Sequence, residues 1–150
     1  MEQQNILSHY EQSIQWVKEL EQLSEEQWRT PIKEEKWSIA EVIGHLIPWD
    51  EFILKDRMPY FFKDIDLPKG PDAQALNDQA AAESRIRTKE ETIERFAATR
   101  QTLLSALKEI DDELWSKELN ISKSTLSLTA YFQGMVEHDN HHFEQIKKVI

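Results

Sequence analysis

The stretch LTAYFQGMVEHDNHHFEQIKKV, residues 128–149, decides the fold. Taken as a helix with a seven-residue repeat, it places one column of side chains on one face: Leu128, Tyr131, Met135, His138, His142, Gln145 and Val149. The first part of this column is apolar, so we expect it to face the interior of a helical protein. His138 and His142 then occupy positions where a plain bundle would have leucine or isoleucine. The sequence therefore predicts a helix that carries two imidazoles inward.

Two of these histidines have the spacing of a metal-binding pair. Residues four apart on a helix are neighbours, so His138 and His142 can reach one cation, as in zinc helices of the H-E-x-x-H type. A third histidine, His45, lies on the apolar face of another helical segment, whereas His141 falls on a polar column and is expected to face solvent. Three buried neutral imidazoles leave three acceptor nitrogens to satisfy, and a cation does this directly. We predict a divalent-metal site on His45, His138 and His142, with three ordinary core histidines as the alternative.

Three further segments have the periodicity of amphipathic helices, over about residues 3–23, 38–55 and 88–110. The second and third each begin with the pattern of a capping box, in which a Ser or Thr is followed three residues later by Glu. About 30 residues separate these two segments. A connection of that length can cross a whole bundle, so the two helices can run parallel. Within it, residues 72–84 are rich in alanine and are expected to form a short extra helix.

Composition limits the class of protein. The 150 residues suit one domain, residues 1–150, and 31% charged residues with only three glycines suit a soluble helical fold. A net charge of −10 without a basic stripe argues against nucleic acid as a partner. No apolar run approaches a membrane span and the N-terminus is unlike a signal peptide, so we expect a cytoplasmic protein with no membrane contact. The absence of cysteine leaves His, Asp, Glu or water as metal ligands.

Two motifs carry a resemblance to a known family. The stretches WSIAEVIGHL, residues 37–46, and HDNHHFEQI, residues 138–146, are similar to motifs of the DinB/YfiT-like superfamily. The resemblance covers essentially the whole chain. It implies an all-α, four-helix bundle of up-down-down-up topology, with a long crossover between helices 2 and 3 and a metal on His45, His138 and His142. It also implies frequent homodimers, and some relatives are thiol S-transferases that use bacillithiol or mycothiol.

The expected chemistry follows from the ligand number. Three protein ligands leave an open position for water or substrate, as in catalytic zinc sites. We expect one divalent ion, zinc or nickel first and manganese or iron as alternatives, because imidazole suits several metals. On family grounds the function is a metal-dependent thiol S-transferase that takes a small-molecule substrate and a low-molecular-weight thiol such as bacillithiol. A metal-dependent hydrolase and a non-catalytic metal- or ligand-binding stress protein are the alternatives.

Two acids are candidates for an assisting catalytic role. Asp139 follows His138, and Glu41 lies one turn before His45, so either could orient an imidazole from behind. A solvated helix charge at Asp139 and a capping role for Glu41 are the structural alternatives. Trp49 and Tyr131 could line a pocket, although packing in the core is favoured for both.

Overall fold

The computed structural model describes residues 2–63, 65–121 and 124–150. The long helices are α1 (Glu2–Glu19), α3 (Ile39–Phe52), α4 (Ala73–Ile86), α5 (Lys89–Lys108) and α6 (Leu128–Lys147). A short helix, α2 (Glu25–Arg29), precedes α3, and strands β1 (Glu118–Ile121) and β2 (Ser124–Ser127) pair in antiparallel fashion before α6. Single turns of 3-10 helix cover Leu20–Gln22, Met58–Tyr60 and Asp112–Ser116, and one π-helical turn, Ile53–Arg57, extends α3.

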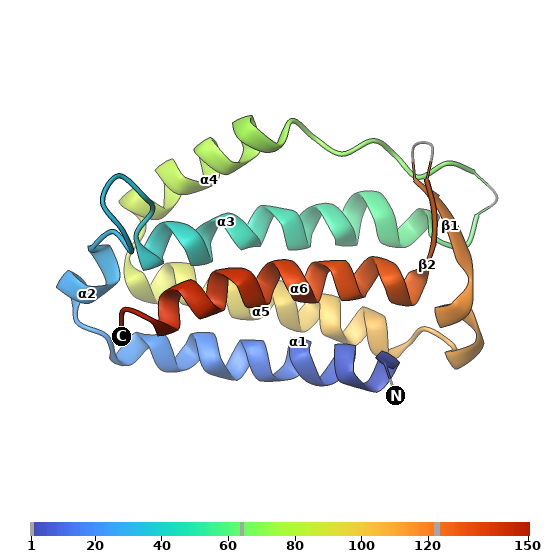
Figure 1. Ribbon diagram of the computed structural model, residues 1–150, viewed down its shortest axis with the longest axis horizontal. Coiled ribbons are helices and arrows are strands. Elements are labelled where there is room, and N and C mark those ends of the chain that lie inside the picture. Colours follow the sequence, from blue (N-terminus) through green and yellow to red (C-terminus); the bar gives the residue numbers. More distant parts are fainter. Residues whose placement is uncertain (1, 64, 122–123) are drawn as a thin grey trace.

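The topology is the predicted one. In Figure 1, α1 and α6 run in one direction along the bundle while α3 and α5 run in the other, which is the up-down-down-up order. The long connection between α3 and α5 returns along the bundle, partly as the extra helix expected in the alanine-rich segment, which is α4. The all-α, four-helix-bundle prediction is confirmed. The small β1–β2 hairpin was not predicted, since strands of four residues show too little alternation to be recognised.

The predicted caps determine where the helices begin. The Ser38 hydroxyl accepts a hydrogen bond from the backbone N–H of Glu41, and the Glu41 carboxylate accepts one from the N–H of Ser38. Thr88 accepts in the same way from the N–H of Glu91 at the start of α5. Each cap satisfies backbone donors that the first turn of a helix leaves without partners. The start of α3 is thereby set, and with it the face on which His45 lies.

The core consists of two hydrophobic clusters. One lies toward the hairpin end of the bundle and includes Phe61, Leu103 and Phe132. The other lies toward the α2 end and includes Trp28, Ile43, Leu46, Phe96 and Phe143. Four buried polar residues, one from each bundle helix, are joined by hydrogen bonds from Arg100: Ser13, Asp50, Arg100 itself and Asp139. We call these four residues the polar layer.

Helix α4 lies against α3 at very short range. A Cβ atom at Gly44 would lie 1.6 Å from the Oγ atom of Ser84, which is fully buried in α4. Only a residue without a side chain lets the two backbones approach in this way. Gly44 directly precedes His45, so this contact also helps to hold the segment of α3 that carries the candidate ligand.

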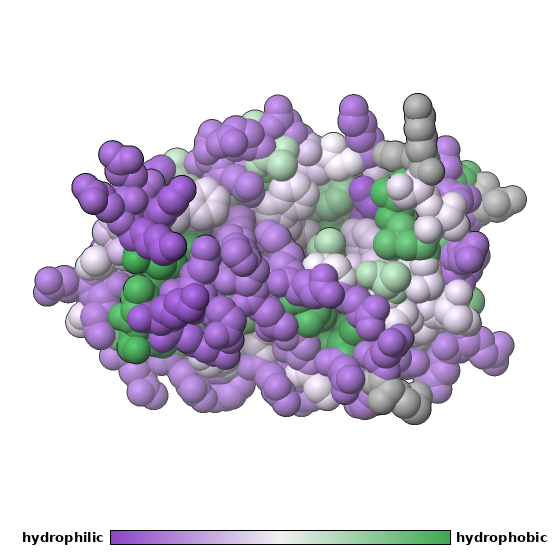
Figure 2. Space-filling model, viewed as in Figure 1, coloured by the Kyte–Doolittle hydropathy of each residue, from purple (hydrophilic) through white to green (hydrophobic). Residues whose placement is uncertain are grey.

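The visible surface is mostly hydrophilic. Figure 2 shows hydrophobic residues at the end of the bundle where α6 finishes and also near the β1–β2 strands. Val149 and Ile150 at that end are about half exposed. Within the described residues, no helix has both the length and the apolar character needed to cross a membrane.

Candidate metal centre

The structure brings the three predicted ligands together from two helices. His45 projects from α3, and His138 and His142 project from α6, so that one potential ligand nitrogen of each lies within 4.8 Å of the others. The ring centroids of His45 and His142 are 4.7 Å apart, as are those of His138 and His142. Three imidazoles at this spacing can share one cation.

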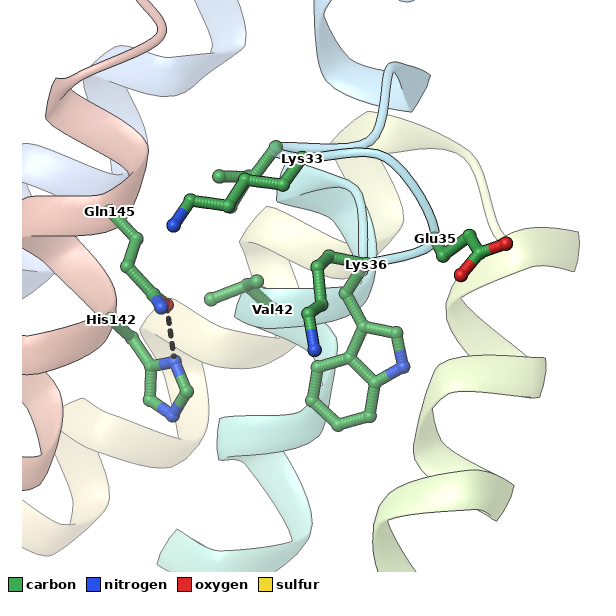
Figure 3. Close-up of a pocket in the computed structure, with 8 residues that line it drawn as sticks. Lys33, Glu35, Lys36, Val42, His142 and Gln145 are labelled. Carbon is green, nitrogen blue, oxygen red and sulfur yellow. Dashed lines mark hydrogen bonds between the residues drawn. The ribbon is translucent and has the colours of Figure 1, made fainter.

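Hydrogen bonds determine which nitrogen each ring presents. Nδ1 of His45 lies against the backbone carbonyl oxygen of Val42, and because a carbonyl only accepts, Nδ1 must carry the proton. Nδ1 of His142 lies 3.2 Å from Oε1 of Gln145 and donates in the same way (Figure 3). Both rings are left with an unprotonated Nε2. A carbonyl partner behind a histidine is the usual support of a metal ligand, so the donor set fits a divalent cation.

The rings of His45 and His142 are neutral without a metal. Burial lowers the pKa of His45 to about 4, against an ordinary value of 6.5, because the apolar surroundings disfavour the imidazolium. Burial also lowers the pKa of His142, and a charge on the neighbouring His138 would lower it further. At neutral pH neither His45 nor His142 carries a second proton that a cation would have to displace.

The centre lies at the edge of the bundle, which corrects the predicted inward column on α6. His138 is exposed and His142 is partly buried, whereas the buried residues in this half of the helix are Asp139, Phe143 and Ile146. A seven-residue column drifts by about 20° per heptad around a straight α-helix, so it does not fix which side chains face the core, and contacts with other helices, described below, set the rotation. The histidines lie beside the core rather than in it, where a small molecule can approach. His141 faces solvent, as predicted.

The two candidate acids have other partners. Asp139 is 3% exposed, and its carboxylate accepts hydrogen bonds from Arg100 at 2.6 Å and from His9 at 2.8 Å. The expectation of a solvated helix charge at Asp139 is therefore wrong. Glu41 performs the capping role and lies 3.8 Å from Arg85. Within the described residues neither acid bonds to a site histidine, and their catalytic roles stay predictions.

Sequence reasoning missed three residues of this network. Arg100 and His9 hydrogen-bond to Asp139, and Asp50 hydrogen-bonds to Arg100. The Arg100 guanidinium donates two hydrogen bonds to Asp50, both 2.9 Å long, and two more to Asp139. It also lies over the ring of Phe96, with its Cζ atom 4.7 Å from the ring centroid. The available signal was the position of Arg100 within the apolar face of α5.

These contacts set the electrostatics and the rotation of α6. Burial disfavours charge on both Asp139 and Arg100. The Arg100 guanidinium and the His9 hydrogen bond outweigh it at Asp139 and hold the pKa of that carboxyl below its usual range, and Asp50 together with Asp139 raises the pKa of Arg100. Because Asp139 is drawn into the polar layer, the adjacent His138 is turned toward the edge of the bundle, facing His45.

A pocket of about 330 Å³ opens beside the centre (Figure 3). Its walls come from the loop between α2 and α3, from the start of α3 and from α6: Ile32, Lys33, Glu35, Lys36, Trp37, Val42, His142 and Gln145. The Trp37 ring lies 4.7 Å from the ring of His45, so the pocket and the histidine cluster are continuous. Trp49 and Tyr131 are not among the lining residues. Trp49 bonds to Asn77 of α4, and Tyr131 packs on Phe61 in the core.

Known proteins share the sequence pattern and the fold of this chain. The sequence model of the DinB superfamily matches residues 10–146. Among solved structures, the fold is similar to that of YfiT from Bacillus subtilis, described as a probable metal-dependent hydrolase with an unusual four-helix bundle topology. The TM-score is 0.79 at 16% identity, over 98% of this chain and 85% of that one. No curated protein sequence matches the chain. The three histidines converge as the resemblance of the two sequence motifs implied. Because the family match covers most of its length, the chain belongs to the DinB superfamily.

Proposed function

We propose that the protein is a metal-dependent enzyme that transfers a low-molecular-weight thiol to a small electrophilic substrate. The observation that carries the proposal is the convergence of His45, His138 and His142 beside an open pocket. The described residues place no fourth acid or histidine in this cluster, so one side of it is available to a reactant. An arrangement with three protein ligands and one open position is typical of catalytic rather than structural metal sites.

Hydrogen bonds at Nδ1 hold the rings of His45 and His142 in place. The Val42 carbonyl and the Gln145 side chain hold the rings of His45 and His142 with Nε2 turned to the cluster. A divalent cation held there would supply Lewis acidity, which lowers the pKa of a thiol or of water that reaches the site. Trp37, packed against His45, provides apolar surface on one side of the pocket beside the centre.

Two features favour a thiol over water as the nucleophile. The chain has no cysteine, so a thiol must arrive as a co-substrate, and the pocket has room for a small molecule. Glu41 and Asp139 are both engaged elsewhere, so none of the carboxylates that the structure describes bonds to the centre as a general base. A thiol has a pKa of about 8.5 and needs little help to ionise, whereas water has a pKa of about 15.7.

Hydrolysis is the second candidate, supported by the description of YfiT as a probable metal-dependent hydrolase. The experiment that separates the two is turnover by the zinc- or nickel-loaded protein, with and without bacillithiol, against electrophilic aryl halides and simple esters. Thiol transfer predicts turnover that requires the thiol and is lost in His142→Ala. His141→Ala is the matched control, because it removes an exposed imidazole from the next position of the same helix. Turnover that does not depend on thiol would select the hydrolase, and none under either condition would refute both.

A further inference from the structure

We propose that Lys33 and Lys36 form an anion-binding subsite beside the metal centre, so that the substrate or co-substrate carries a carboxylate or phosphate group. The inference deepens the proposed function and rests on it for the identity of the reaction. The binding of an anion does not depend on the proposed function, because the two lysines line the pocket whatever chemistry the histidines perform.

A tight turn places the two lysines side by side. The backbone N–H of Lys36 donates to the carbonyl of Lys33 at 3.0 Å, which closes a four-residue turn. The third residue of the turn, Glu35, has a φ of 63°. Positive φ at that position is typical of a type II turn and is normally taken by glycine, so a glutamate there is held at some cost by its surroundings. The base of the loop is fixed by a hydrogen bond from Ile32 N–H to the Trp37 carbonyl and by a β-bridge between Pro31 and Ser38.

The turn places the two lysine side chains of the loop apart from its Glu35 carboxylate. In Figure 3 the Lys33 side chain extends toward α6 and the Lys36 side chain lies on the pocket side, whereas the Glu35 carboxylate points away. Within the described part of the chain, neither lysine forms an ion pair with an acid. In a protein with 28 acidic and 18 basic residues, two lysines that line one pocket without an acidic partner among the described residues run against the overall charge. The charged residues that line the pocket are therefore two lysines and one glutamate, a net positive lining in an acidic protein.

The opposite wall completes the site. When Oε1 of Gln145 accepts from His142, the amide nitrogen of Gln145 keeps both hydrogens and can donate to a ligand. Trp37 and Val42 provide apolar surface in the same pocket. An occupant that satisfies all of these groups is a small molecule with an anionic group between the lysines, a short apolar part, and its reactive atom toward His142. The volume of about 330 Å³ is at the small end of ligand pockets.

The test uses anions that need no catalysis. Inorganic phosphate and succinate are titrated into the metal-free protein and followed by two-dimensional NMR, in the wild type and in the Lys33→Gln/Lys36→Gln double variant. We expect binding in the wild type, weaker at high salt, and about tenfold weaker in the double variant, because two exposed charge contacts are lost. Lys148→Gln is the matched control, since it removes one positive charge from an exposed position on the segment after α6, outside the pocket. The anion that binds more tightly identifies the group as a phosphate or a carboxylate.

The outcomes separate this inference from the proposed function. Equal binding of both anions by the wild type and the double variant would overturn the subsite, as would no binding by the wild type. A second comparison uses the zinc-loaded protein with 3-mercaptopropionate and 2-mercaptoethanol. The subsite predicts that the charged thiol binds more tightly and that the double variant removes the preference. Anion binding that depends on the lysines, without thiol-dependent turnover, would leave the subsite standing and refute thiol transfer.

Discussion

Acidification is the perturbation that tests the metal centre most directly. Protons and metal compete for the same imidazole nitrogens, so each ligand that is protonated in the free protein adds one to the slope of log affinity against pH. Burial lowers the pKa of His45 to about 4, which is below the ordinary histidine value of 6.5. His45 is therefore already neutral at pH 5 and has no proton for the metal to displace until the pH approaches 4.

The magnitude follows from this count. With His45 already neutral, at most two of the three ligands can release protons between pH 5 and pH 6, so affinity should fall by no more than about 100-fold per pH unit, or about 3 kcal/mol. Three ordinary histidines would approach about 1000-fold per pH unit in the same interval. The buried ring thus makes the centre more tolerant of acid than three exposed histidines would be.

The assay is calorimetric titration of zinc into the metal-free protein from pH 5 to pH 7.5 at constant ionic strength, with circular dichroism at each pH to verify that the chain is folded. His141→Ala should give the same slope, because that ring is exposed and lies outside the cluster. A slope near three between pH 5 and pH 6 would show that His45 is protonated in the free protein. The reasoning from its burial would then be refuted.

Four further outcomes are expected. Elemental analysis should find about one divalent ion per chain in the wild type and in His141→Ala, and little in His45→Ala, His138→Ala or His142→Ala; retention by His142→Ala with loss in His141→Ala would overturn the assignment. Arg100→Met should lower the free energy of unfolding by about 3–5 kcal/mol in urea denaturation, because it leaves two buried carboxylates without their cation; a loss below 1 kcal/mol would mean that the polar layer is hydrated. Gly44→Ala should cost about 1–3 kcal/mol through its contact with Ser84, and Ser84→Gly in the same chain should recover much of that loss on thermal denaturation; no recovery would place the strain elsewhere. Finally, we propose a homodimer on the family resemblance, and light scattering that gives a mass near 17.7 kDa at micromolar concentration would contradict it.

Much of the site could be predicted because its parts depend on local geometry. Two histidines four residues apart share a helix face whatever surrounds the helix, and the Ser38 and Thr88 caps act within one turn. The length of the connection allowed α3 and α5 to run parallel, and the family resemblance implied that they do. For the histidine pair and the caps, the interaction that decides the outcome links residues close in sequence.

The rotation of α6 depended on contacts across the bundle. A repeat of seven residues predicts one apolar column, but the partner that settles the phase is Arg100, on a different helix. Its attraction for Asp139 brings that carboxylate inside and leaves His138 at the edge. No pattern within residues 128–149 contains this information, because the energy of a buried ion pair depends on which helix packs opposite.

The sequence by itself determined the helical class, the capped starts of α3 and α5, and the identity of the three converging histidines, since periodicity and spacing carry all three. Only the tertiary structure decided that the centre opens at the edge of the bundle, that Asp139 belongs to a buried charge layer, and that Lys33 and Lys36 face the pocket. Those features depend on how the loop before α3 and the helix α6 pack against each other across about 110 residues of chain. Long-range packing of this kind is set by the energy of the whole core, and a local sequence pattern does not encode it.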